Sequence, residues 1–132
     1  MEFIKAVKAT GRKKLIMTAL WTEACLSFPA LDALREGYEV YPVVDAVGGT
    51  SVASHEAALR RIEQAGGKPI TWVQLLCELQ RDWMRKKTVP AFMNIFIETG
   101  GTAGIQFSYD RESDEGGVIG VTKEAASKVL TK

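Results

Sequence analysis

A cysteine follows an apolar run in the segment LIMTALWTEACLSFPALDAL, residues 15–34. The run predicts a β-strand, and a helix predicted to start at an N-cap on Thr22 places Cys25 in its first turn. Free backbone N–H groups and the positive helix end favour a thiolate over a thiol there. The same N–H groups can hold an oxyanion while the sulfur attacks a carbonyl. Cys25 is therefore a candidate nucleophile.

The alternative for Cys25 is structural, because free cysteines are among the most buried residues and most are inert. Cys77 provides the contrast, since it falls in the middle of a predicted helix, in QLLCELQ, and is expected to pack in the core. Pro29 has no N–H to donate to the carbonyl of Cys25, so the helix should kink next to the cysteine.

Two further side chains, those of Asp45 and His55, are of types that take part in catalysis. Asp45 follows the second predicted strand and is interpreted as a loop or cap residue. His55, the single histidine, lies on an apolar helical stripe and is interpreted as a partly buried structural residue. A Cys25–His55 pair would need that stripe to face the cysteine, which the crossover connection argues against. No residue cluster has metal-ligand spacing, and neither a metal nor a cofactor is expected.

The elements that must position these residues alternate between strand and helix, which predicts a parallel α/β sheet with right-handed crossovers. The predicted strands cover 15–20, 38–46 and 68–71, with a possible late strand at 104–110. The predicted helices cover 2–9, 22–36, 51–66, a segment from Trp72 to Trp83, and 89–99. Pro42 inside the second strand predicts a bulge or a less central strand, because it cannot donate to the ladder.

Composition sets the remaining expectations. The 132 residues suit one domain at 1–110, followed by a polar tail at 111–132. Seventeen basic and sixteen acidic residues give a formal charge of +1, so neither nucleic acid nor a membrane is expected as a partner. Without a signal-peptide pattern and with two cysteines, the chain is expected to be cytoplasmic with reduced thiols.

Five segments resemble the isochorismatase-like cysteine hydrolases, most closely the YcaC-like branch, from about Phe3 to about Tyr109. They are ATGRKKLIM, WTEAC, EGYEVYPVVDA, GGTSVASHEAAL and PITWVQLLCELQRDW. The resemblance implies a Rossmann-like three-layer sandwich with a six-stranded parallel sheet, of which this chain has the last three strands. It also implies hydrolysis of a small molecule, often at an amide or imide C–N bond.

The resemblance assigns roles around the WTEAC elbow. Cys25 is the implied nucleophile, a cis peptide bond is implied between Leu20 and Trp21, and the N–H groups of Trp21 and Cys25 form the implied oxyanion hole. The family's Asp and Lys lie well upstream of the nucleophile, but only 24 residues precede Cys25 here. No residue matches either one, and Lys13 and Lys14 fall at the wrong end of the strand.

Three interpretations remain open. The chain is half of a cysteine hydrolase with a small-molecule substrate, or a non-catalytic assembly half-domain, or an unstable fragment without activity. In the assembly interpretation, copies of the chain or a partner chain cover the unpaired edge of strand 15–20, because an uncovered apolar edge invites association.

Overall fold

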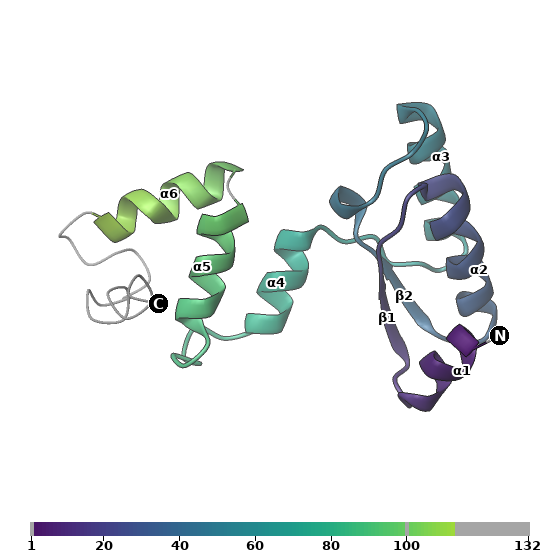
Figure 1. Ribbon diagram of the computed structural model, residues 1–132, viewed down its shortest axis with the longest axis horizontal. Helices are drawn as coiled ribbons and strands as arrows, with labels where there is room; N and C mark the ends of the chain where they lie inside the picture. Colours follow the sequence, from purple (N-terminus) through teal and green to yellow (C-terminus); the bar gives the residue numbers. More distant parts are fainter. Residues whose placement is uncertain (1, 100, 113–132) are drawn as a thin grey trace. The chain divides into compact units, whose positions relative to one another are not determined.

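The structure is a computed structural model that describes residues 2–99 and 101–112 (Figure 1). The chain divides into two compact units, Met1–Leu75 and Leu76–Lys132. The boundary between the units falls within one helix, α4 (Trp72–Gln80). Each unit has its own packing and is described separately.

A parallel pair of strands organises the first unit. Strand β1 (Lys14–Met17) pairs with β2 (Glu39–Pro42), and Leu15 lies opposite Val40. The other elements of this unit are α1 (Glu2–Ala9), the turn η1 (Thr22–Leu26), α2 (Ser27–Arg35), the short helix η2 (Val44–Ala46) and α3 (Val52–Gln64). The predicted parallel α/β class is confirmed, with shorter strands than the sequence suggested.

The third predicted strand, 68–71, is reduced to a single parallel bridge between Val43 and Ile70. The N–H groups of Lys68 and Ile70 donate to the carbonyls of Val40 and Pro42, at 2.8 and 2.9 Å. The next bond in this parallel pattern would come from the N–H of residue 42, which proline lacks. Pro42 therefore ends β2 as a regular, buried residue, and the cost of the proline falls on the 68–70 segment.

Helices α2 and α3 pack together on one side of the strand pair (Figure 1). Fully buried side chains from η1, α2, β2 and α3 form this core: Leu26, Ala30, Val40 and Ile62. Helix α2 ends at the predicted place, because Gly37 adopts a φ of +82° that favours glycine. Strand β1 is not covered on both faces, since Ile16 is 52% exposed.

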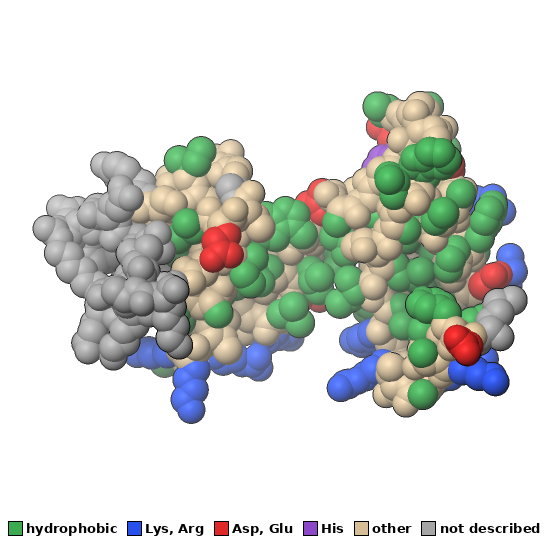
Figure 2. All heavy atoms as spheres, viewed as in Figure 1, with side chains coloured by type: hydrophobic (Ala, Val, Ile, Leu, Met, Phe, Trp, Pro, Cys, Tyr) green, Lys and Arg blue, Asp and Glu red, His purple; other side chains and the backbone are tan. Residues whose placement is uncertain are grey.

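An apolar groove of about 490 Å³ runs along β1 between α1 and α2. Its walls include Phe3, Ile16 and Phe28, each more than half exposed. Within the described residues β1 pairs only with β2, so its outer edge is open, as predicted. Figure 2 shows the hydrophobic side chains that this unit leaves on its surface.

Helices α5 (Val89–Thr99) and α6 (Gly101–Glu112) pack against each other in the second unit. A ladder of rings joins Trp83, Phe92, Phe96 and Phe107, with successive centroids 4.9, 5.0 and 5.2 Å apart. The boundaries of α5 were predicted correctly.

The strand suggested for 104–110 is wrong, because this segment lies within α6. A Cβ at residue 104 would lie 2.4 Å from the carbonyl oxygen of Phe96, so Gly104 permits close contact with α5. Phe107, three residues later, contacts Phe96 on that side, while Ile105 stays exposed. Helical packing thus overrides the alternating pattern. Residues 113–132 lie outside the described part, and the division at residue 110 stays a prediction.

Candidate active site at the WTEAC elbow

Cys25 lies in η1, a single π-helical turn between β1 and α2. The N–H of Leu26 donates to the carbonyl of Trp21, five residues earlier, at 3.2 Å. A kink is predicted here because Pro29 has no N–H to donate to the carbonyl of Cys25, and the structure has a π turn just before this proline. The Cys25 side chain is exposed, so the buried-packing alternative is wrong for this residue.

The peptide bond between Leu20 and Trp21 is cis, at the position that the resemblance implied. Both side chains are more than half exposed. In the part of the chain that the structure describes, the Trp21 N–H donates to no protein acceptor. The elbow thus leaves at least one amide next to Cys25 available, whereas the assignment of an oxyanion hole stays a prediction.

Thr22 does not cap the helix, and that prediction is wrong. The N-cap position is Trp21, which makes no side-chain cap bond. The Thr22 side chain is fully buried, and its Oγ1 lies 2.9 Å from Nδ1 of His55. A buried hydroxyl needs a polar partner, and α3 provides one.

His55 therefore faces the elbow, which corrects the inference from the crossover topology. The half-buried, structural character predicted for this histidine is observed, because its ring nitrogen bonds to Thr22. The first turn of α3 packs directly on η1, which the crossover connection alone does not reveal.

Sequence reasoning also missed a contact between Glu23 and Thr50. One carboxylate oxygen of Glu23 accepts the N–H of Thr50 at 2.9 Å and its hydroxyl proton as well. The side-chain hydrogen bond from Thr50, followed by the backbone one, lowers the pKa of Glu23. A lowered pKa makes Glu23 a poor general base near neutral pH. The available signal was an acid two residues before the cysteine and a Gly-Gly-Thr loop, GGT.

The remaining candidates lie elsewhere. Oδ1 of Asp45 accepts the N–H of Trp72 at 2.9 Å, so its interpretation as a cap residue is confirmed. Cys77 is exposed on α4, so the prediction that it packs in the core is wrong. Its place in an apolar helical sequence did not bury it, because helical periodicity sets the face but not its cover.

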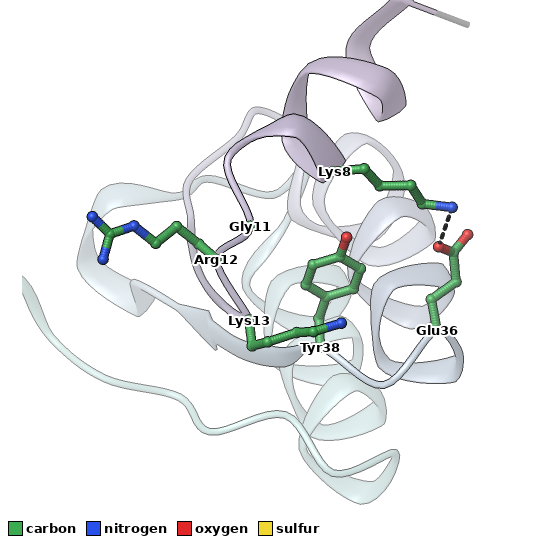
Figure 3. A pocket seen from close by; sticks show the side chains of 6 residues that line it. All are labelled: Lys8, Gly11, Arg12, Lys13, Glu36 and Tyr38. Carbon is green, nitrogen blue, oxygen red and sulfur yellow. Dashed lines mark ion pairs between the residues drawn. The ribbon is translucent and has the colours of Figure 1, made fainter.

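A second hollow, of about 340 Å³, lies where α1 meets the start of β1 (Figure 3). There Lys8 pairs with Glu36 at 2.9 Å and Lys13 lies over the Tyr38 ring. Neither this hollow nor the apolar groove includes Cys25. Among the described residues, no group of three or more His, Cys, Asp or Glu side chains is placed to hold a metal ion. No helix in that part of the chain is long and apolar enough to cross a membrane.

Residues 1–74, which contain the whole elbow and its contacts, match the family of the isochorismatase domain. The chain belongs to the isochorismatase family. The probable hydrolase YcaC of Escherichia coli strain K12 is 48% identical over 82 residues, which are 62% of this chain and 39% of that protein. The predicted family is therefore confirmed.

Two solved structures show the same fold. The YcaC gene product of Escherichia coli, an octameric hydrolase of unknown specificity, matches with a TM-score of 0.76 and 38% identity. This match covers 85% of the present chain and 54% of the relative. YcaC from Pseudomonas aeruginosa, solved with hexane-2,5-diol and covalent acrylamide, matches with a TM-score of 0.64 and 38% identity, over 76% and 54%. The chain thus spans about half the length of these relatives.

Proposed function

We propose that the chain is part of an isochorismatase-like cysteine hydrolase in which Cys25 attacks a small-molecule substrate. The exposure of Cys25 in an uncapped π-helical turn carries this proposal. Uncapped N–H groups at a helix start stabilise negative charge, both on sulfur and on an oxyanion. The covalent acrylamide in the Pseudomonas aeruginosa relative is chemically consistent with an active-site thiolate.

For an amide or imide substrate, Sγ of Cys25 would form a bond to the carbonyl carbon, and the carbonyl π electrons would move to oxygen. When the tetrahedral species collapses, the C–N bond breaks and the nitrogen leaves with a proton. Water then cleaves the thioester and restores the thiol. The N–H of Trp21, and that of Cys25, are the proposed donors to the oxyanion.

Proton transfer is the step for which this chain has no assigned group. Asp45 is engaged at the start of α4, and hydrogen bonds lower the pKa of Glu23. We therefore propose that the Asp and Lys of the family come from polypeptide beyond these 132 residues. The chain alone is expected to bind covalent probes at Cys25 but to turn over substrate poorly. A cytoplasmic setting, with reduced thiols, remains part of this proposal.

Acrylamide alkylation tests the role of Cys25, with Cys77 as the internal control because both thiols are exposed. At pH 7, mass spectrometry of the two peptides is expected to show Cys25 reacting roughly tenfold faster, since the thiolate is the attacking species. Cys25→Ser should abolish labelling of its own peptide and leave that of Cys77 unchanged. Equal, slow labelling in a folded sample contradicts the proposal.

A second candidate function is assembly, and the open edge of β1 favours it. The groove beside this edge exposes Phe28 by 61% and Ile16 by 52%. The Escherichia coli relative is octameric. In this alternative, a second copy of the chain covers the groove and edge, and the half-domain has no catalytic role of its own.

Sedimentation of the full chain at several concentrations tests this alternative. A concentration-dependent oligomer is expected, and Ile16→Lys should dissociate it because a charge in an apolar interface is costly. Val52→Lys is the matched control, since Val52 is 74% exposed on α3 and does not line the groove. A well-folded monomer contradicts self-assembly, and a complex that forms only with another polypeptide points to a different partner.

A further inference from the structure

We propose that His55 is a positioning residue for Cys25 and acts through the buried hydroxyl of Thr22. The inference rests on the proposed role of Cys25 as the nucleophile. It assigns to the histidine no contact with substrate. Its function is to hold the turn η1, which contains the cysteine.

The bond between His55 and Thr22 joins α3 to η1. Oγ1 of Thr22 lies 2.9 Å from Nδ1 of His55, and the threonine is 0% exposed. Removing one partner of a buried hydrogen bond leaves the other with no substitute from water. Because Thr22 and Cys25 share one five-residue turn, a shift of Thr22 changes the setting of the cysteine.

The loop before α3 makes the same connection from a second direction. The N–H of Thr22 donates to the carbonyl of Gly48 at 2.8 Å, and Thr50 donates twice to Glu23. Residues 48–55 therefore hold both residues at the start of η1.

The loop before α3 and the turn η1 are closely packed at Gly49. A Cβ at this position would lie 2.8 Å from Cβ of His55 and 3.0 Å from Oε2 of Glu23. That Glu23 oxygen is buried and has no hydrogen-bond partner among the described residues.

Side chains from α3 and its loop thus replace the missing N-cap. An ordinary cap would place a side-chain oxygen on the free N–H groups of the first turn. Here the hydroxyl of Thr22 is directed to His55, so α3 holds the first turn from outside, and the Trp21 N–H donates to no acceptor among the described residues. Loss of the Thr22–His55 bond is expected to let the turn relax and to weaken the stabilisation of a thiolate at Cys25.

The test measures the acrylamide alkylation rates of Cys25 and Cys77 in the 132-residue chain at pH 7 and pH 10. Thr22→Val and His55→Leu remove the bond, and both are expected to lower the Cys25:Cys77 ratio at pH 7 roughly fivefold. Thr22→Ser keeps the hydroxyl, and His55→Asn can place an amide near the former Nδ1. Both conservative variants should retain most of the ratio.

The pH 10 measurement separates positioning from simple access. Ordinary cysteines are ionised at pH 10, so the ratio there reports exposure of the sulfur alone. A change in positioning lowers the ratio at pH 7 and leaves it nearly unchanged at pH 10. A merely structural role of His55 lowers the ratio equally at both pH values, and this result would overturn the inference.

If Thr22→Val unfolds the chain, alanine substitutions at two neighbouring glycines provide the test instead. Gly49→Ala drives a methyl group against the His55 backbone and should lower the ratio at pH 7. Gly48→Ala meets only the flexible, exposed end of Leu20 and should not. A high ratio that survives Gly49→Ala and His55→Leu overturns the positioning role alone. A ratio near one in the unaltered chain overturns the nucleophile itself.

Discussion

The helix that carries Cys25 begins differently from the two helices that follow it. At α3, Oγ of Ser51 accepts the N–H of Ser54 at 3.1 Å. At α4, Oγ1 of Thr71 accepts the N–H of Gln74 at 3.1 Å. At η1 no side chain caps the start, although a threonine stands where a cap was expected. The difference shows that a threonine at a helix start can bond to a neighbouring helix instead of capping its own.

What separates the two kinds of start is where the hydroxyl goes. Ser51 is exposed and Thr71 is half-buried, and each hydroxyl accepts an N–H group of the helix that follows it. Thr22 is buried beside α3, and its hydroxyl bonds to His55 instead of to an N–H group of its own helix. A cap stabilises a helix by accepting hydrogen bonds from the N–H groups of its first turn. Those N–H groups are then no longer free to bind an anion. The start of η1 therefore differs from those of α3 and α4 in lacking a side-chain cap.

Substituting the cap residues gives the largest effect expected from this comparison. Ser51→Ala and Thr71→Ala should each lower the free energy of unfolding by about 1 kcal/mol, whereas glycine at either position should cost only a few tenths of a kcal/mol. Thr22 should behave in the opposite way. Thr22→Gly is expected to cost more than Thr22→Ala, because it removes a buried side chain and adds backbone freedom within a turn. Urea unfolding at pH 7 measures all of these changes.

Two outcomes would contradict this distinction between Thr22 and the cap residues. If Thr22→Gly is as mild as Ser51→Gly, then Thr22 is an ordinary cap residue in solution. Conversely, if Ser51→Gly is as costly as Ser51→Ala, the serine contributes something other than capping. Val52→Ala, at an exposed position next to Ser51, controls for nonspecific effects at the start of α3.

Local rules predicted the parts of the fold that depend on local chemistry. The end of α2 before Gly37 and the bounds of α5 follow from residue type and spacing. The nucleophile position of Cys25 and the cis peptide bond between Leu20 and Trp21 were implied by the resemblance of WTEAC to the family. The contacts of Thr22 and His55 could not be predicted, because 33 positions separate them and only the packing of α3 on η1 brings them together. Helix α6 was missed for the same reason, since its contact with α5 decides its conformation.

The smallest expected effect concerns the charge on Glu23, which only the uncapped start uses. Hydrogen bonds from Thr50 lower the pKa of this carboxyl below its ordinary 4.5. The stabilisation from the charged form is therefore complete well above pH 4.5 and is lost as the pH falls through the lower folded value. Glu23→Gln should reduce the free energy of unfolding at pH 7 by less than Ser51→Ala does, because glutamine keeps an amide oxygen that can accept the Thr50 bonds. The gap between Glu23→Gln and the unaltered chain should close as the pH falls below 4.5, measured by urea unfolding from pH 7 to pH 3. Glu56→Gln, at an exposed position on α3, is the matched control and should show no such closing gap. A gap that stays constant across this range would mean that the Thr50 bonds do not depend on the charge of Glu23, and that α3 holds η1 through Thr22 and His55 alone.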